Sequence, residues 1–178
     1  MKAFVLAEPG KVKWFDAPEP QLVPYGAILK PVAVTPCSSD VHTVFGGGSK
    51  KQDNLVLGHE CIAEVVSVGE NVCDFKTGDR VAVPAITPDW REKSIQEGND
   101  RHASAPFSGH QLGRTQPGVF SERFLIKDAD TTLAHIPQKI SEEQALMSVD
   151  VVTTGFTGAE YADIKLSLIH ISEPRDCS

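Results

Sequence analysis

The chain has 178 residues, 40% of them hydrophobic, and its 17 Lys and Arg against 24 Asp and Glu give a formal net charge of −7. A chain of this length can bury roughly two-thirds of its unfolded surface within one domain. The acidic balance argues against nucleic acid or an anionic membrane as a partner, because both bind clustered cations.

No targeting or membrane segment is expected. The apolar start of the chain reaches Glu8 too early for the core of a signal peptide, and no run approaches the ~20 apolar residues of a membrane span. We therefore expect a cytoplasmic protein whose four cysteines stay reduced.

Alternating or β-branched apolar residues predict that most of the ordered chain is strand. The first predicted strand covers residues 2–6 and ends at a turn formed by Pro9 and Gly10. The further predicted strands, each bounded by turn residues, cover residues 28–34, 61–68, 80–83 and 119–126. This pattern predicts a mainly β fold.

Two other segments differ from the strands. Residues 84–117 are polar, rich in Gly, Pro and Ser, and without clear period; a loop of this length inside a compact domain often has a function. Ser141 and Gln144 have the Ser-x-x-Gln spacing of a capping box, which predicts a helix running from there toward Met147.

A thiol, an imidazole and two carboxylates are candidate zinc ligands, at Cys37, His59, Glu60 and Asp150. They are far apart in sequence, so only the fold can bring them together. Taken alone, Cys37 is more typical of a small buried side chain than of a ligand, and His59 is more typical of a core or surface histidine. Glu60 is either a ligand or a carboxylate that orients the site.

Three motifs gain specificity when they are taken together. They are Cys-x-Ser-Asp-x-His from residue 37, Gly-His-Glu from residue 58, and Val-x-x-Val-Gly-Glu-x-Val-x-x-Phe-x-x-Gly-Asp-Arg-Val from residue 65. With these motifs, residues 1–166 resemble the catalytic domain of zinc-dependent medium-chain alcohol dehydrogenases. Asp150, where many relatives have a cysteine, resembles the branch of secondary alcohol dehydrogenases that use NADP.

The resemblance implies a co-chaperonin-like (GroES-like), partly open barrel with a few helices. It also implies one catalytic zinc ion held by Cys37, His59 and Asp150, with Glu60 coordinating in the resting state or lying beside the ligands. Residues 84–117 contain no cysteine, so the second, structural zinc of many relatives is not expected.

The resemblance further assigns residues to the reaction and to the substrate pocket. Ser39 resembles the hydroxyl that bonds the substrate oxygen, and His42 resembles the next member of a relay that passes the proton to solvent. Ala85 and Ile86 resemble an apolar wall of the substrate pocket, although ordinary strand residues are the alternative.

The resemblance also concerns the NADP(H) cofactor. Thr154 resembles the hydroxyl that approaches the nicotinamide, with helix capping as the alternative, and Ser38 would approach the cofactor phosphates. In the family a Gly-x-Gly-x-x-Gly turn and a dinucleotide-binding Rossmann domain follow, and this chain lacks that turn.

The sequence therefore predicts three parts: a GroES-like zinc catalytic domain over residues 1–154, the start of a helix over residues 155–166 that would lead to the missing Rossmann domain, and a tail. The tail, residues 167–178, resembles translated adaptor read-through rather than a protein element. We expect one half of an enzyme, inactive alone.

Three functions stay open. The first is an NADP(H)-dependent oxidoreductase that interconverts small secondary alcohols and ketones by hydride transfer and is homo-oligomeric at full length. The second is another zinc medium-chain dehydrogenase, acting on a polyol, an aldehyde or an amino alcohol. The third is a non-enzymatic module like the co-chaperonin, against which the intact set of Cys37, Ser39, His42 and His59 argues.

Overall fold

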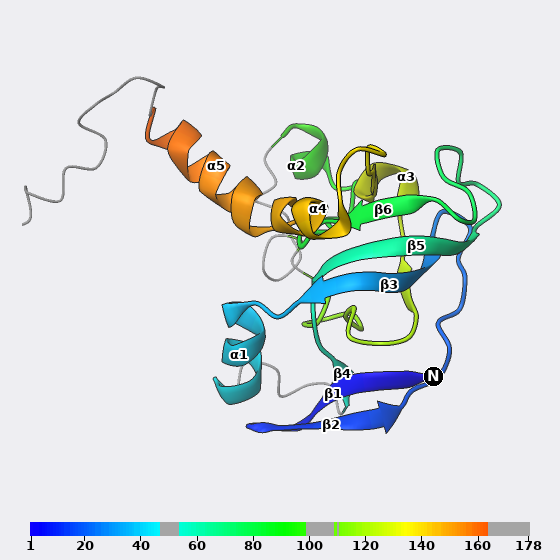
Figure 1. Cartoon of the computed structure of the whole chain (residues 1–178), viewed down its shortest axis with the longest axis vertical. Helices are drawn as coiled ribbons and strands as arrows, with labels where there is room; N and C mark the ends of the chain where they lie inside the picture. Colours follow the sequence, from blue (N-terminus) through cyan, green and yellow to red (C-terminus); the bar gives the residue numbers. More distant parts are fainter. Residues whose placement is uncertain (47–53, 99–108, 110, 164–178) are drawn as a thin grey trace, which may run out of the picture.

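The computed structural model describes residues 1–46, 54–98, 109 and 111–163 (Figure 1). The strands in these ranges are β1 (Lys2–Glu8), β2 (Lys11–Asp16), β3 (Ala27–Thr35), β4 (Leu55–Val56), β5 (Glu60–Val68), β6 (Arg80–Val83), β7 (Phe124–Ile126) and β8 (Ala134–His135). The helices are α1 (Ser38–Phe45), α2 (Lys93–Gln96), α3 (Ala129–Thr132), α4 (Glu142–Ser148) and α5 (Val151–Tyr161).

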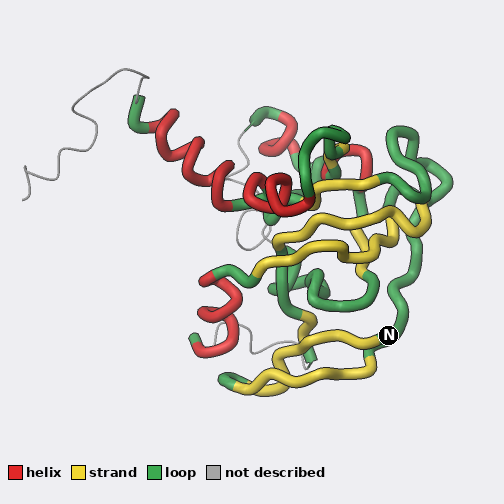
Figure 2. The backbone as a smooth tube through the Cα atoms, in the orientation of Figure 1, coloured by secondary structure: helices red, strands yellow, loops and turns green. Residues whose placement is uncertain are grey.

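The strands form two sheets. The smaller has the order β2-β1-β4 and the larger the order β7-β3-β5-β6-β8, and all pairings between these strands are antiparallel. Neither sheet closes on itself, and Figure 2 shows the two sheets joined by loops rather than by continuous strands. The predicted mainly β, partly open barrel with a few helices is confirmed.

Strand β5 lies between two packed layers, because its alternate side chains are buried on opposite faces. Cys61 and Ala63 belong to the main core on one face of the larger sheet, with Leu29 of β3. Ile62 faces the other way and packs against Ala145 of α4 and Val149 just after it. Helix α4 is therefore anchored on the larger sheet. This contact fixes the position of the segment that follows the helix.

Several predicted elements are confirmed. The strand predicted over residues 80–83 is β6, and β1, β3 and β5 contain the strands predicted over residues 2–6, 28–34 and 61–68. Helix α4 begins after Ser141, whose hydroxyl accepts a hydrogen bond from the Gln144 backbone N–H at 3.3 Å, as the capping box predicts.

The strand predicted over residues 119–126 is wrong for most of its length, because only Phe124–Ile126 forms β7. The backbone N–H groups of Val119 and Phe120 donate instead to the carbonyls of Gly58, at 3.1 Å, and Leu57, at 2.9 Å. An irregular loop thereby packs against the segment that carries His59. The elements β2, β4, α1, α2, α3 and β8 were not predicted.

Helix α5 begins at Val151, before the helix start predicted at residue 155, and ends at Tyr161. It extends from the sheets at the upper left of Figure 1, and none of its residues is buried. The tail predicted over residues 167–178 lies outside the described residues, and the division at residue 154 stays a prediction.

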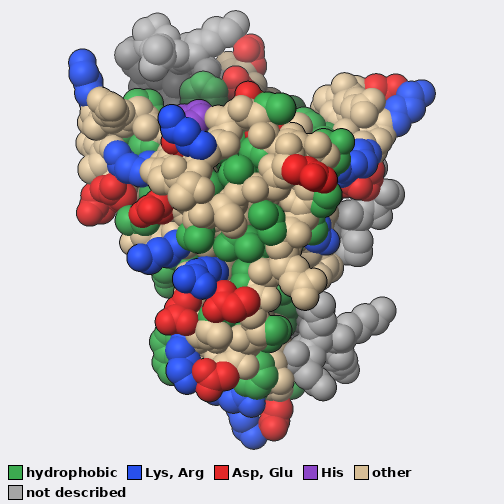
Figure 3. All heavy atoms as spheres, turned by 90° about the vertical axis from the view of Figure 1, so that its right-hand side faces the viewer, with side chains coloured by type: hydrophobic (Ala, Val, Ile, Leu, Met, Phe, Trp, Pro, Cys, Tyr) green, Lys and Arg blue, Asp and Glu red, His purple; other side chains and the backbone are tan. Residues whose placement is uncertain are grey.

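Among the described residues, no helix is both long and apolar enough to cross a membrane. On the face shown in Figure 3, acidic and basic side chains are interspersed.

Candidate metal centre

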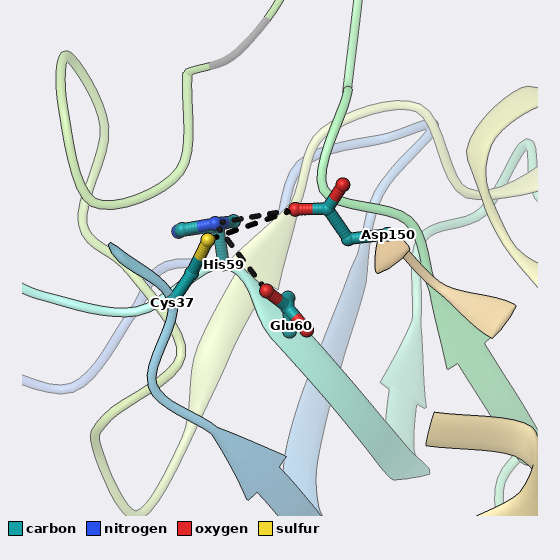
Figure 4. Close-up of side chains that lie close together, drawn as sticks. All are labelled: Cys37, His59, Glu60 and Asp150. Atoms are coloured by element: carbon teal, nitrogen blue, oxygen red, sulfur yellow. Dashed lines mark hydrogen bonds and ion pairs between the residues drawn. The ribbon is translucent and has the colours of Figure 1, made fainter. Parts of the chain in front are cut away.

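Three separate segments bring the predicted ligands together at one end of the larger sheet. Cys37 is the N-cap residue of α1 and follows β3, while His59 immediately precedes Glu60, the first residue of β5. Asp150 stands between α4 and α5. Figure 4 shows the four side chains pointing toward a common centre.

The four donor atoms lie within 4.8 Å of one another. His59 Nε2 is 3.7 Å from Asp150 Oδ2 and 3.8 Å from Glu60 Oε1, and Cys37 Sγ is 4.0 Å from the same Asp150 oxygen. Tetrahedral zinc bonds of about 2.0–2.3 Å place neighbouring ligand atoms roughly 3.3–3.6 Å apart. These three distances exceed that spacing by a few tenths of an ångström, and the bound of 4.8 Å exceeds it by about 1 Å, so small side-chain movements would fit the four donors to a zinc ion.

The burial of the cluster also fits a cation. His59 and Glu60 are both 2% exposed, and Asp150 adds a second carboxylate to the same small space. Two carboxylates and a thiol that face each other in a partly buried space are unfavourable unless a proton or a cation compensates their charge. A divalent metal ion would supply that compensation.

Asp40, which was not predicted as a site residue, connects two of the ligand segments. Its Oδ2 accepts a hydrogen bond from the Cys37 N–H at 2.9 Å, and its Oδ1 accepts one from the Gly58 N–H at 3.2 Å. The same Oδ1 lies 3.3 Å from His59 Nδ1, which leaves Nε2 directed toward the other ligands. A carboxylate on the far ring nitrogen is the usual way in which a metal-binding histidine is oriented.

The opposite charges of Asp40 and His59 stabilise each other. Burial raises the pKa of the Asp40 carboxyl, but hydrogen bonds from His59, Cys37 and Gly58 outweigh burial and hold this pKa below its ordinary value. Burial lowers the pKa of His59, but Asp40 and then Cys37 outweigh it and hold the imidazole pKa above its ordinary value. Asp40 is therefore an anion that fixes the imidazole ring.

The Glu60 carboxyl behaves in the opposite way. Burial raises its pKa, and the nearby Asp150 carboxylate raises it further, while Cys37 and His59 oppose the rise. The Asp150 carboxylate therefore disfavours a second negative charge on Glu60.

The structure brings Ser39 to the cluster, whereas His42 is not among the grouped donors. The Ser39 hydroxyl oxygen is 3.2 Å from His59 Nε2. His42 lies on α1, three residues after Ser39, and its side chain is exposed. The Ser38 hydroxyl is exposed and lies 4.0 Å from Cys37 Sγ.

Ala85 and Ile86 lie beside the loop that presents Asp150. The Ala85 N–H donates a hydrogen bond to the carbonyl of Val149 at 3.2 Å, and its side chain is buried. Ile86 is 42% exposed and lines a surface pocket of about 460 Å³ together with Trp90. The predicted apolar wall thus has one buried and one exposed residue.

The Thr154 side chain contacts a predicted ligand, which the sequence did not indicate. Its hydroxyl donates a hydrogen bond to Asp150 Oδ1 at 2.8 Å, one helical turn from the start of α5. The assignment of Thr154 and Ser38 to the cofactor stays a prediction.

The family is established by comparison with known proteins. Residues 24–138 match the alcohol dehydrogenase GroES-like domain, well over half of the chain. The chain therefore belongs to the alcohol dehydrogenase GroES-like domain family. This match lies inside the catalytic domain predicted over residues 1–154.

Two curated relatives and one solved structure are among the similar proteins. The chain is 49% identical to the NADP-dependent isopropanol dehydrogenase of Thermoanaerobacter brockii and 45% identical to that of Clostridium beijerinckii, over 93% of this chain and 47% of each relative. A zinc-dependent alcohol dehydrogenase 2 from Streptococcus pneumonia matches 83% of this chain and 41% of its own with 30% identity and a TM-score of 0.71. The chain thus spans about half the length of these relatives.

Proposed function

We propose that this chain is the zinc-holding catalytic half of an NADP(H)-dependent oxidoreductase that interconverts small secondary alcohols and ketones by hydride transfer. The observation that carries this proposal is the convergence of Cys37, His59 and Asp150, with the Ser39 hydroxyl at the edge of the cluster. Similarity to two NADP-dependent isopropanol dehydrogenases supports the substrate class and the cofactor.

In this proposal Cys37, His59 and Asp150 would hold one zinc ion, and Glu60 would either be a fourth donor or orient the site from beside the ligands. When bound, zinc supplies a Lewis acid that polarises the oxygen of the alcohol or ketone. Three protein ligands with one exchangeable position are typical of catalytic zinc. The burial of Glu60 and the 3.8 Å between its Oε1 and His59 Nε2 support a place for this carboxyl beside the ligands.

The proton of the alcohol needs a path away from the site. The Ser39 hydroxyl, at 3.2 Å from His59 Nε2, would bond the substrate oxygen, accept its proton and release its own proton to the next group of the relay. His42, exposed on the same helix, would pass the proton to solvent, since imidazole titrates near neutral pH. Ala85 and Ile86 would bound the apolar part of the substrate.

The nicotinamide would have to lie against the polarised carbon at about 3–3.5 Å for hydride transfer. Thr154 and Ser38 would face this cofactor, whose pyrophosphate would be bound by a second domain. The proposal includes a homo-oligomeric full-length enzyme in the cytoplasm, with neither nucleic acid nor membrane as partner.

The test is a chimera that joins residues 1–166 to the complementary half of the Thermoanaerobacter brockii relative. We expect the chimera to reduce acetone and 2-butanone with NADPH in preference to NADH, and the 178-residue chain alone to show no turnover. Cys37→Ser should abolish turnover, whereas Cys73→Ser, which changes an exposed thiol outside the cluster, should preserve it.

Turnover by the 178-residue chain alone would contradict the proposal that the reaction requires a second domain. Ketone reduction that survives Cys37→Ser would contradict the zinc mechanism. A chimera that binds zinc and NADPH but reduces only polyols, aldehydes or amino alcohols would contradict the substrate class.

A further inference from the structure

The two oxygens of the Asp150 carboxylate have different partners. Oδ2 faces the cluster, 3.7 Å from His59 Nε2 and 4.0 Å from Cys37 Sγ. Oδ1 faces the other way and accepts the Thr154 hydroxyl at 2.8 Å. One oxygen is thus directed toward the other donors while the second is held by a neutral hydrogen bond.

Thr154 holds Asp150 at two points. Besides the hydroxyl contact, its backbone N–H donates to the Asp150 carbonyl at 2.8 Å, which is the first hydrogen bond of α5. The hydroxyl is therefore positioned by the helix itself, and its place relative to the carboxylate does not depend on a flexible side chain. A threonine side chain has one torsion before the hydroxyl, so little freedom is lost when the bond forms.

A carboxylate that ligates a metal needs such a partner more than a thiolate does. It can rotate and present either one oxygen or both, whereas a cysteine offers a single sulfur atom. A hydrogen bond to one oxygen fixes which oxygen faces the metal and opposes a two-oxygen contact. Partners of this kind commonly change metal affinity by about 10–100-fold when they are removed.

We propose that Thr154 is a positioning residue of the metal centre, whose hydroxyl holds Oδ1 of Asp150 so that this carboxylate presents only Oδ2. The inference rests on the proposed zinc site and adds a role for Thr154 toward the metal to the one proposed toward the nicotinamide. According to this inference, a hydroxyl is needed at position 154 because the ligand at position 150 is a carboxylate.

The experiment measures the zinc dissociation constant of the 178-residue chain by competition with a chromophoric chelator. Thr154→Val removes the hydroxyl at nearly constant shape, and we expect it to weaken zinc binding by about 10–100-fold. Thr154→Ser keeps the donor and should bind zinc as the unchanged chain does, within about threefold.

Thr153→Val is the matched control, because the Thr153 hydroxyl donates to the Ser148 carbonyl and not to a ligand. It removes the same group from the same helical turn and should leave zinc affinity unchanged. Equal losses in Thr153→Val and Thr154→Val would show that the helix is merely weakened, and would overturn the inference.

A second pair of variants tests the link to the carboxylate. In an Asp150→Cys chain the third ligand has one donor atom, so Thr154→Val should no longer change zinc affinity by more than about twofold. An equal loss in both backgrounds would overturn the proposed link between Thr154 and Asp150.

The visible spectrum of the Co²⁺-loaded chain gives a reading that does not need the Asp150→Cys variant. Release of Oδ1 in Thr154→Val should shift and weaken the bands as the coordination number rises, while Thr154→Ser should keep the original spectrum. An unchanged spectrum with unchanged affinity in Thr154→Val overturns this inference alone. Failure of the unchanged chain to bind zinc overturns the proposed metal centre as well.

Discussion

At the scale of single residues, the centre depends on carboxylates that hold other groups in place. Asp40 joins the start of α1 to the segment before β5 by accepting from the Cys37 and Gly58 N–H groups, and it orients the His59 ring. The segments of Cys37 and His59 are therefore held in position by the protein itself, which lowers the entropy cost of binding a metal ion.

We expect Asp40→Ala to weaken zinc binding by about 10–100-fold, because the His59 ring loses its partner. It should also lower the free energy of unfolding by roughly 1–3 kcal/mol for each buried donor left unpaired. Chelator competition and urea denaturation measure the two effects separately.

Asp130→Ala is the matched control for this prediction. Asp130 likewise accepts two backbone N–H groups, those of Cys73 at 2.8 Å and Asp74 at 3.0 Å, but it is remote from the cluster. It should lose roughly 0.5–1.5 kcal/mol of stability per hydrogen bond and no zinc affinity. Equal zinc binding by Asp40→Ala and the unchanged chain would refute the role of Asp40.

At the scale of elements, the elements with clear periodicity could be predicted and those that depend on contacts could not. Strand β6 was predicted with its observed bounds, and the start of α4 followed from the Ser141 capping box. Helix α1 has weak helix formers, so its formation depends on its N-terminal hydrogen bonds and on Val44, which packs against Leu6 and Leu57. The sequence around Val119 is typical of a strand, but the Val119 N–H donates a hydrogen bond to a carbonyl in a loop instead.

The same distinction holds for the candidate site. The resemblance indicated Cys37, His59 and Asp150 because their types and spacing are specific. It did not indicate that the Thr154 hydroxyl would contact Asp150, since a threonine one turn into a helix is equally suited to capping or to solvent. That contact depends on the backbone geometry at the start of α5.

The contact between the segment around Gly58 and the loop around Phe120 leads to a prediction at this scale. Gly58 has φ of +89°, and a Cβ added there would lie 2.5 Å from a ring atom of Phe120. We expect Gly58→Ala to destabilise the chain by roughly 1–2 kcal/mol from backbone strain and by a further 1–3 kcal/mol or so from overpacking.

Gly78→Ala separates these two effects. Gly78 has φ of +91° but no atom within 4 Å of an added Cβ, so it should show the backbone cost alone. Urea denaturation of both variants provides the comparison. A Gly58→Ala chain no less stable than Gly78→Ala would mean that the Phe120 ring moves aside freely.

At the scale of the whole molecule, the zinc content follows from where donor groups gather. Within the described ranges, one group of His, Cys, Asp and Glu donors could hold a metal ion, and residues 84–117 contain no cysteine for a second, structural zinc. We expect elemental analysis to find one zinc per chain. A value near two would contradict this expectation, and Cys37→Ser should remove most of the single ion.

The thermal stability of the whole chain should depend on whether this zinc ion is bound. A ligand that binds only the folded state stabilises it by about 2.7 kcal/mol at 100 times its dissociation constant. For a domain of this size that corresponds to a rise in Tm of roughly 5–11 °C on adding zinc to the chelated chain.

The fold should persist without zinc, because the Asp40 hydrogen bonds and the packing of Ile62 under α4 do not involve the metal. Calorimetry with and without zinc measures the shift, which Cys37→Ser should largely lose and Cys73→Ser should keep. Complete unfolding on chelation would instead mean that metal binding, rather than the buried sheet, carries the stability of this domain.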